Sequence, residues 1–333
     1  MNNDIQLFTH YKARAYYNIC QSGRNQSSIF IAYSSVLPIY IFGIIINVVL
    51  VYVIYTNRKF HTPSYILSAN ASISDIMLAI SSLLLGIFSV IRNSSSGLDN
   101  SSFFIICKCT TFGYVSSYTI SALSFMTISI DRYLTLRDQT NSNSPFVRPT
   151  VLKLTMIMIW IVGICLSIPI IFITKKVTCQ DSVCSLQLFR HIEPTLLTLH
   201  ILNIVITYPV PLVTVSILYY NVIKKMKSLP IPLNENANSN FNHRHVHATK
   251  MMIIASILFM INTSVLYILS VFQGFMDSNL VTIFRNQALA VPILIFTALL
   301  TACEVMQNPI LFYSYNKTFR KAVHSIKPSS TVS

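Results

Sequence analysis

Seven long apolar runs, separated by short polar segments, constrain the fold of this chain more than any other feature of its sequence. Only Asp75 and Glu304 interrupt them with a charged side chain. Each run is long enough to cross a hydrocarbon core of ~30 Å as an α-helix. We therefore predict an all-α membrane protein, built as a seven-transmembrane helix bundle. The seven runs are residues 29–55, 65–91, 109–130, 154–174, 194–223, 251–276 and 286–315.

The composition favours the membrane class and argues against nucleic-acid binding. Hydrophobic residues make up 53% of the 333-residue chain and charged residues 10%, which is too little polar material to cover several soluble domains. The formal net charge is +14, but a nucleic-acid-binding protein gathers its basic residues on a soluble face. Here they lie in short segments between apolar runs. We expect contact with membrane lipids and no nucleic-acid partner.

The positions of lysine and arginine predict the orientation in the membrane. With the N-terminus outside the cell, 15 of the 24 Lys and Arg residues fall in cytoplasmic segments, in line with the positive-inside rule. In the same orientation, three glycan acceptor motifs lie outside, at Asn25, Asn93 and Asn100. Charge and glycosylation motifs thus agree on a multi-pass plasma-membrane protein with its N-terminus outside.

Three parts follow from this topology. Residues 1–28 form an extracellular N-terminal segment, 29–315 the seven-helix domain, and 316–333 a cytoplasmic amphipathic helix with a tail. The amphipathic helix is predicted because apolar residues recur at helical spacing from Phe319 to Ile326, with basic residues on the other faces.

The segment 228–247 is rich in Asn, Pro and His and is predicted to be a polar, mobile cytoplasmic linker. Its alternating histidines, His243, His245 and His247, could suggest a metal site. Zinc sites usually need four converging ligands, however, and no partner set is visible. No metal site is predicted.

The third apolar run is the one that can connect the two sides of the membrane. No charged residue occurs from Cys109 to Ile130, whereas a cysteine pair precedes this run and Asp131-Arg132-Tyr133 follows it. At ~1.5 Å per residue, a helix from Cys107 to Arg132 places its ends on opposite sides of a bilayer. One end can be cross-linked in an oxidising space, while the other is a charged cluster at the inner interface.

Short motifs occur in order, about one per run. The first run contains Asn47 and the second contains Asp75. Cys107 precedes the third run, and Asp131-Arg132-Tyr133 follows it. The remaining motif residues are Trp160, Pro169, Tyr208, Pro211, Tyr219, Asn308, Pro309, Phe312, Asn316, Phe319 and Arg320. As an ordered set, these motifs resemble the rhodopsin-like (class A) family of G-protein-coupled receptors over roughly residues 29–326.

This resemblance implies a cell-surface receptor, not an enzyme, that binds an extracellular ligand and activates a heterotrimeric G protein. It also implies arrestin as a further cytoplasmic partner. Arg132 would face the G protein when the helices separate, and Asp131 would hold it beforehand; the alternative is that Arg132 is a simple interfacial anchor. The residues implied in G-protein coupling are Asp131, Arg132, Tyr133, Tyr219, Asn308, Pro309 and Phe312.

Two departures from the family pattern keep other functions open. The Phe-x-x-Cys-Trp-x-Pro motif of the sixth helix reads Phe259-Met-Ile-Asn-Thr263-Ser-Val265, which lacks the Trp and the Pro, and Phe312 replaces a Tyr. A seven-helix receptor that does not couple to G proteins is therefore one alternative. An ion transporter or channel is another, because the intramembrane acids could line an ion path, although the sequence shows no internal repeats.

The resemblance places the ligand in the outer third of the bundle, among polar but uncharged groups. This suits a small neutral molecule or a peptide. Tyr114 stands where amine receptors carry an Asp, which argues against a simple amine. The expected ligand-binding residues are Tyr114, Val115, Tyr118, Asn203, Thr207, Tyr267 and Ser270.

An ion site is expected deeper in the bundle, at Asp75, Ser121, Glu304 and Asn308. The family holds sodium near the first of these in its inactive state, and no other cofactor is expected. A charged side chain at mid-bilayer costs ~2.5–3.5 kcal/mol, so two acids are not expected there without a role. Either a cation lies between the carboxylates or one of them takes up a proton.

The family pattern also implies a disulfide from Cys107 to the loop after the fourth helix, which an oxidising exterior favours. That loop contains Cys179 and Cys184, and the spacing does not choose between them.

Overall fold

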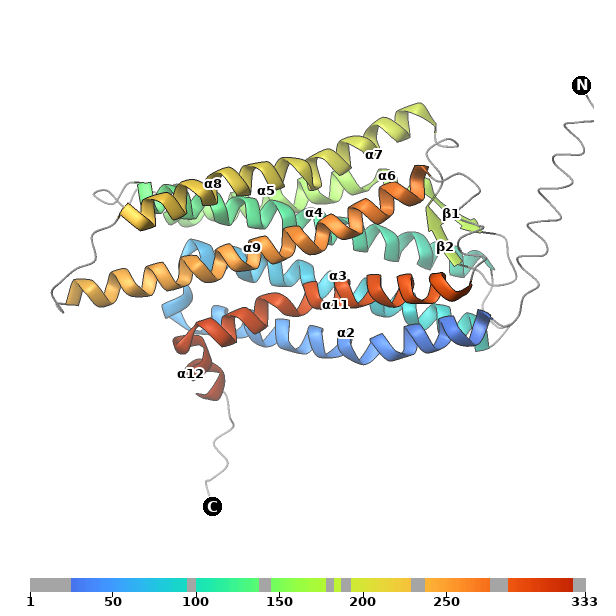
Figure 1. Cartoon of the computed structure of the whole chain (residues 1–333), viewed down its shortest axis with the longest axis horizontal. Helices are drawn as coiled ribbons and strands as arrows, with labels where there is room; N and C mark the ends of the chain where they lie inside the picture. The colour runs from blue at the N-terminus through green and yellow to red at the C-terminus, as the bar shows by residue number, and fades with distance from the viewer. Residues whose placement is uncertain are drawn as a thin grey trace, which may run out of the picture.

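The computed structural model describes residues 25–94, 100–137, 145–177, 183–186, 193–228, 237–275 and 287–325. Side chains are described for residues 34–88, 91, 101–137, 145–174, 193–227, 248–268 and 295–325. The described part of the chain is an elongated bundle of long helices that run side by side (Figure 1). This architecture confirms the predicted all-α, seven-helix fold.

Seven passes across the bundle account for the long helices. Five passes are continuous helices, whereas the fourth and fifth are each divided in two. In order, the passes are α2 (Asn25–Thr56), α3 (Pro63–Ser94), α4 (Asn100–Arg137), α5 (Pro149–Ser167) with α6 (Pro169–Ile173), α7 (Pro194–Thr207) with α8 (Pro209–Ser228), α9 (Ala237–Phe275) and α11 (Gln287–Tyr315). Two 3-10 turns, η1 (Arg58–Phe60) and η2 (Pro145–Val147), precede α3 and α5.

Prolines divide the two interrupted passes. Pro169 and Pro209 each stand at the first position of the second segment, and proline lacks the N–H that would continue the hydrogen-bond ladder. Before Pro209, the backbone of Tyr208 departs from helical geometry, with φ −121° and ψ −70°. Such breaks are tolerated in a membrane because neighbouring helices satisfy the released backbone groups.

Six described helical segments are long and apolar enough to cross a membrane by composition alone, and α4 is not among them. Its hydropathy is low because it is rich in Ser and Thr. It nevertheless contacts α3, α5, α6, α7, α8 and α9, so much of its surface faces other helices rather than lipid. Hydroxyls such as those of Ser124 and Thr127 are satisfied by the carbonyl four residues back. We therefore count α4, the third pass in chain order, as a membrane span, which brings the total to seven.

Three hydrogen bonds between side chains and neighbouring helices join α2 to α11, and α3 to α4 and α5. Asn47 on α2 donates from Nδ2 to the carbonyl of Val305 on α11, at 2.7 Å. The Trp160 indole N–H on α5 donates to Asn70 Oδ1 on α3 at 2.9 Å, and the Asn70 amide donates to Ser124 on α4 at the same distance. Asn70 thereby joins α3 to both α4 and α5, and Trp160 is the motif residue in this contact.

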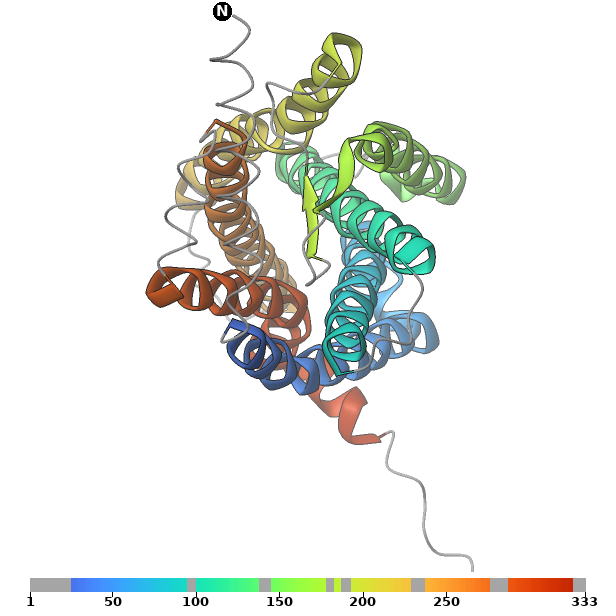
Figure 2. The same ribbon diagram turned by 90° about the vertical axis from the view of Figure 1, so that its right-hand side faces the viewer.

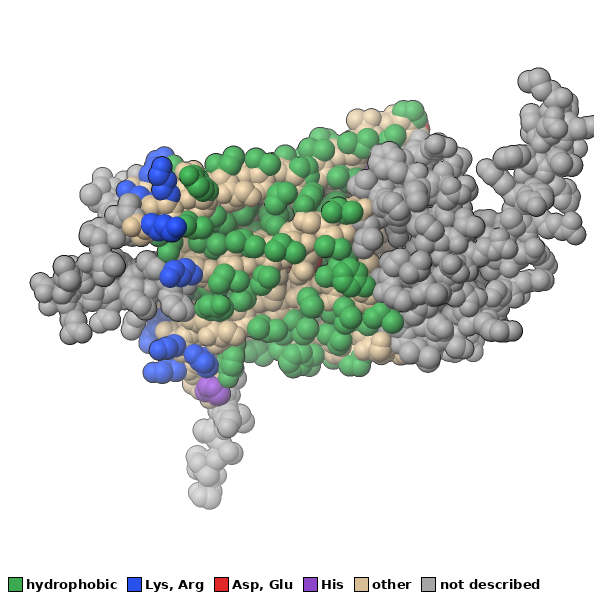
Figure 3. All heavy atoms as spheres, viewed as in Figure 1, with side chains coloured by type: hydrophobic (Ala, Val, Ile, Leu, Met, Phe, Trp, Pro, Cys, Tyr) green, Lys and Arg blue, Asp and Glu red, His purple; other side chains and the backbone are tan. Residues whose placement is uncertain are grey.

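The two ends of the bundle differ. At one end, β1 (Thr174–Val177) and β2 (Val183–Leu186) form an antiparallel hairpin that lies over the ring of helices (Figure 2). At the other end, α12 (Lys317–Ser325) turns away from α11, as predicted for the amphipathic helix. On the face shown in Figure 3, Lys and Arg gather at this second end, and hydrophobic side chains cover the surface between the ends.

Several helices begin before the apolar runs that predicted them, including α4 at Asn100 rather than residue 109. α2 begins at Asn25 rather than residue 29, and α9 begins at Ala237, inside the segment 228–247 that was predicted to be a linker. Pro230 and Pro232 precede α9, whereas no Pro or Gly lies between Ala237 and the sixth apolar run. Nothing in this stretch of sequence interrupts a helix, which accounts for its extension beyond the apolar run. The short β-hairpin was not predicted.

Candidate functional site

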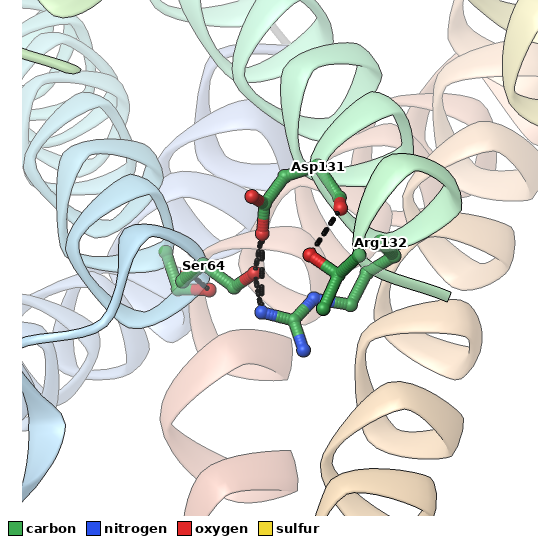
Figure 4. Close-up of polar contacts among 5 residues, drawn as sticks. Ser64, Asp131 and Arg132 are labelled. Carbon is green, nitrogen blue, oxygen red and sulfur yellow. Dashed lines mark hydrogen bonds and ion pairs between the residues drawn. The ribbon is translucent and has the colours of Figure 1, made fainter. Parts of the chain in front are cut away.

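Asp131, Arg132 and Ser64 form a buried polar cluster at the inner end of α3 and α4, the end that carries α12 (Figure 4). The Arg132 Nη2 donates to Asp131 Oδ2 at 3.1 Å. The Ser64 hydroxyl, from the first turn of α3, donates to the same carboxylate oxygen and accepts from Arg132. Asp131 is 1% exposed and Arg132 is 7% exposed. The guanidinium is thus held inside the bundle instead of extending to water.

This burial argues against a simple interfacial anchor, because an anchoring arginine extends its guanidinium to water. Among the described residues, the neighbouring Asp131 is the one ion-pair partner of Arg132, and the Nε of Arg132 is buried without a hydrogen-bond partner. The hold on Arg132 therefore comes from α3 and α4.

Beside this cluster, α8 meets α9 through Tyr219. Its hydroxyl lies 2.9 Å from Ser256 Oγ, and the Tyr219 side chain is buried. Tyr133, one residue after Arg132, faces a groove of about 310 Å³ between α4 and α8. The groove is lined by Tyr133, Leu136, Arg137, Asn221, Val222, Lys224 and Lys225. The inner end thus offers a partly open surface with three basic residues next to the Arg132 cluster.

Phe312 packs into an aromatic group where α11 meets α12 and α3. Its ring lies 5.7 Å from that of Tyr65 and 5.6 Å from that of Phe319, between centroids. Asn316 donates to the Tyr65 hydroxyl at 3.1 Å. Pro309, one turn earlier, is buried. The group holds the end of α11 by edge-to-face packing, and Tyr65 supplies a hydroxyl near the position where Phe312 lacks one.

The predicted ion-site residues come together in the middle of the bundle. Asn308 Nδ2 on α11 donates to Asp75 Oδ2 at 2.8 Å, and Ser121 Oγ on α4 donates to Asp75 Oδ1 at 3.3 Å. Ser74 joins them through a 2.7 Å contact with Ser121. Asp75 on α3 therefore links three helices, and both of its carboxylate oxygens have a partner.

Glu304, one turn toward the hairpin end of α11 from Asn308, is in a different state. It is 1% exposed, and neither of its carboxylate oxygens has a hydrogen-bond partner among the described residues. It interacts electrostatically with Asp75 and with Tyr118. Leaving a buried charged group without a partner is costly. Glu304 is thus the group at which a bound cation or a proton would be most stabilising.

The expected ligand residues of α4 lie about one and two helical turns from Ser121, toward the hairpin end. Tyr114 is half-buried and its hydroxyl lies 3.1 Å from Thr301 Oγ1 on α11. Its ring contacts that of Tyr118, with centroids 5.0 Å apart. Val115 is also half-buried. Tyr118 is 4% exposed, and its hydroxyl has no hydrogen-bond partner within the described part of the chain.

On the fifth and sixth passes, Tyr267 of α9 stacks on Tyr208, with centroids 5.4 Å apart. Thr207 is buried and lies 3.2 Å from Thr119, between their hydroxyl oxygens. Asn203 donates its amide to the carbonyl of Leu166 on α5, at 3.0 Å, so this amide N–H is used between helices. The side chain of Ser270 lies outside the described residues.

Cys107 is disulfide-bonded, whereas Cys109, Cys165 and Cys303 are free thiols. The disulfide partner of Cys107 is therefore one of the three remaining cysteines of the chain: Cys20, Cys179 or Cys184. The two expected partners, Cys179 and Cys184, have side chains outside those that the structure describes. The same holds for the glycan acceptors Asn25, Asn93 and Asn100.

Several contributors to these clusters were not predicted, among them Ser64, Thr301 and Ser264. Ser264 accepts from the Tyr208 hydroxyl at 2.6 Å. Thr301 and Ser264 are small polar residues among many in apolar runs, and Ser64 immediately precedes such a run. The role of each depends on which helix crosses it. No local sequence signal could have found them.

A sequence model described as "7 transmembrane receptor (rhodopsin family)" matches residues 46–312 of the chain. The chain is similar to the 5-hydroxytryptamine receptor 1F of Cavia porcellus, with 26% identity over 187 residues, 55% of this chain and 47% of that receptor. It is also similar to the C-C chemokine receptor type 7 of Homo sapiens, with 27% identity over 183 residues, 54% and 46% of the two chains. The chain thus spans about half the length of these relatives.

Among solved structures, the crystal structure of squid rhodopsin superposes on the chain with a TM-score of 0.73. The superposition covers 91% of this chain and 81% of that chain at 16% sequence identity. At this identity the likeness shows the seven-helix fold alone.

Proposed function

Because this chain belongs to the rhodopsin family of seven-transmembrane receptors, we propose that it is a cell-surface receptor that activates a heterotrimeric G protein. The chain is a multi-pass membrane protein. In the proposed orientation, in the plasma membrane with the N-terminus outside, the hairpin end faces the extracellular ligand and the α12 end faces the cytoplasm. Arrestin is proposed as a second partner at the cytoplasmic end.

The observation that carries this proposal is the state of Arg132. A buried guanidinium, held by Asp131 and Ser64 beside a partly open groove with basic residues, can be presented to a partner when α3, α4 and α8 rearrange. A permanent structural pair would need no such groove next to it. Release of Arg132 is therefore the proposed step that couples the bundle to the G protein.

Buried polar contacts offer a route from the ligand end to this cluster. Tyr114 contacts α11 at Thr301, Tyr118 interacts with Glu304, and Asp75 binds Asn308 one turn further inward. Each of these contacts joins α11 to α3 or α4. A ligand that moves α11 would therefore disturb Asp75 before it reaches the Arg132 cluster. This is a two-state coupling in which each state has its own set of contacts.

The receptor function is tested by screening a ligand library in cells that express promiscuous G proteins, followed by nucleotide exchange with purified receptor and a panel of G-protein subtypes. Ligand-dependent exchange on at least one subtype supports the proposal. The non-coupling alternative is favoured by Thr263 and Val265, which replace the Trp and Pro of the family motif. A ligand that binds without exchange on any subtype would establish that alternative.

We expect Ser64→Ala to raise ligand-independent nucleotide exchange, by about tenfold or more, because a hydrogen bond to a charged group contributes roughly 1.5–3 kcal/mol. The substitution removes the contact of Arg132 with α3 but leaves its pair with Asp131 in place. Ser68→Ala is the matched control, since the Ser68 hydroxyl donates to the carbonyl of Ser64 and does not reach Arg132. Equal basal exchange in the two variants would contradict the role of Ser64.

A sodium ion is proposed at the Asp75 site in the inactive bundle. The donor set fits a hard cation, because it offers two carboxylates together with the oxygens of Ser121 and Asn308. The orphaned oxygens of Glu304 provide acceptors that the described protein groups do not use. A bound cation would neutralise the paired acids and hold α3, α4 and α11 together.

From this proposal, sodium is expected to lower basal nucleotide exchange in the wild type, and this effect should be lost in Asp75→Asn and weakened in Glu304→Gln. Exchange would be measured against sodium concentration at constant ionic strength, with potassium as the replacement ion. Glu193→Gln, at an exposed acid before α7, is the matched control and should respond as the wild type does. Identical sodium curves for all four proteins would show that the two buried acids share no ion site.

A further inference from the structure

Three tyrosines lie within electrostatic range of the unpartnered carboxylate of Glu304. We call Tyr114, Tyr118 and Tyr267 the tyrosine cage. All three interact electrostatically with Glu304. Two are on α4 and one is on α9, while Glu304 is on α11. The carboxylate therefore lies where three helices converge, below two rings that are half-buried and one that is buried.

The cage contains polar groups that lack a partner as well as aromatic rings. Tyr118 Oη and both Glu304 carboxylate oxygens are buried without a hydrogen-bond partner among the described residues. Thr263 Oγ1 on α9 is buried and unpartnered in the same way. Buried polar groups in folded proteins are nearly always satisfied. The Tyr118 hydroxyl and the Glu304 carboxylate interact with each other, so one polar group bound from outside the chain would satisfy both of them.

Thr263 is at the right depth to belong to this group. Phe259, Thr263 and Tyr267 are spaced by four on α9 and so share one face. Phe259 lies 4.8 Å from Phe125, between ring centroids, and Tyr267 stacks on Tyr208. Thr263 therefore lies between these levels, within about one turn of Tyr118 along the bundle. Its small side chain leaves more room there than a tryptophan would.

The chemistry of this niche selects for an organic cation. A carboxylate supplies a charge-assisted acceptor for an ammonium N–H, and aromatic faces attract the same cation through their quadrupoles. Asp75 is not equivalent, because both of its oxygens already accept hydrogen bonds from Ser121 and Asn308. With Glu304 ionised, a neutral ligand would leave its charge without compensation in a low-dielectric site, whereas an ammonium group would compensate it without protonation of the acid.

We propose that Glu304 and the tyrosine cage bind the ammonium group of a small amine ligand. The expectation against an amine came from Tyr114 alone, which stands where amine receptors carry an acid. In this chain the acid is on α11 and deeper in the bundle, with Tyr114 above it. Only the role of the amine as a signal rests on the proposed receptor function; its binding does not.

The test uses three pairs of probes that differ in charge and little in shape: benzylamine and benzyl alcohol, cyclohexylamine and cyclohexanol, and phenethylamine and 2-phenylethanol. The midpoint of thermal unfolding of the purified, full-length receptor would be measured in potassium chloride. At saturation, at least one amine should raise the midpoint by roughly 5 °C, while its alcohol has little effect. If no amine separates from its alcohol, the inference is wrong.

Two variants and one control test whether the amine response depends on Glu304 and the tyrosine cage. Glu304→Gln should raise the half-saturating amine concentration by about tenfold or more, and Glu193→Gln should leave it unchanged. Tyr118→Phe, which keeps the ring and removes the unpartnered hydroxyl, should retain amine selectivity with a smaller loss. An unchanged amine response in Glu304→Gln would overturn the inference, even if the receptor activates G proteins.

A sodium arm distinguishes an organic from an inorganic cation. If the niche binds an ammonium group, replacing potassium by sodium should shift the amine response to higher concentration, since both cations are drawn to the same acids. If sodium alone gives a Glu304-dependent rise in the unfolding midpoint and the amines add nothing, the niche is an inorganic cation site and the proposal fails. A failure of nucleotide exchange in separate assays would affect the proposed function but not this result.

Discussion

Arg132→Ala is expected to reduce ligand-stimulated nucleotide exchange by about 30-fold or more while ligand binding stays measurable. Truncating one partner of a buried, hydrogen-bonded charge pair typically costs 2–5 kcal/mol. Here the lost guanidinium is the group that Asp131 and Ser64 hold until the inner end opens. The ligand residues lie several helical turns away on α4, so their geometry should persist. Exchange and radioligand binding would be measured on the same receptor preparation.

Arg148→Ala provides the matched control for this prediction. Arg148 is the same residue type at the same end of the bundle, and it is exposed at the start of α5. Its loss changes the charge of the inner face without touching the cluster on α3 and α4. If Arg132→Ala and Arg148→Ala reduced exchange equally, the effect would be one of general charge, and release of Arg132 would not be the coupling step.

The number and order of the spans could be predicted because each follows from a local property of the sequence. Seven apolar runs are each long enough to cross a membrane, and one motif residue per run fixes the order. α4 shows where this reasoning reaches its limit. Its hydropathy is low because it faces protein, yet the absence of charge from Cys109 to Ile130 was sufficient to identify it as a span.

The polar contacts between helices could be predicted only in part. Asp75, Ser121 and Asn308 were expected together because the family motifs align them, and they do meet. Ser64 was not expected, because its contact with Arg132 depends on how the start of α3 crosses the end of α4. The sequence around a serine at the edge of an apolar run does not indicate which helix will pack against it.

The unpartnered state of Glu304 likewise required the structure. The sequence showed two acids within the membrane and suggested that they share a cation or a proton. It could not show that Asp75 has partners for both oxygens whereas Glu304 has none among the described residues. This asymmetry depends on side-chain placement across three helices. Because of this asymmetry, Glu304, which departs from the family pattern, is a better candidate for binding a further group than Asp75, which belongs to that pattern.

Cys107→Ser is expected to abolish surface expression, or to leave a receptor that no longer responds to ligand. Cys107 is disulfide-bonded at the outer part of α4, and its side chain is buried. Removing a native disulfide typically costs 2–5 kcal/mol. The loss falls on α4, which contacts most of the other spans and β1. Damage at this position should therefore spread through the bundle and the hairpin end.

Cys109→Ser is the control, because Cys109 is an exposed free thiol two residues further along the same helix. It should reach the surface and respond like the wild type. Of Cys179→Ser and Cys184→Ser, only one should reproduce the Cys107→Ser defect, and that one identifies the partner. Surface expression would be measured by antibody labelling of an N-terminal tag on intact cells, which also tests the proposed orientation. Normal surface level and signalling in Cys107→Ser would show that the outer end of α4 does not depend on the bridge.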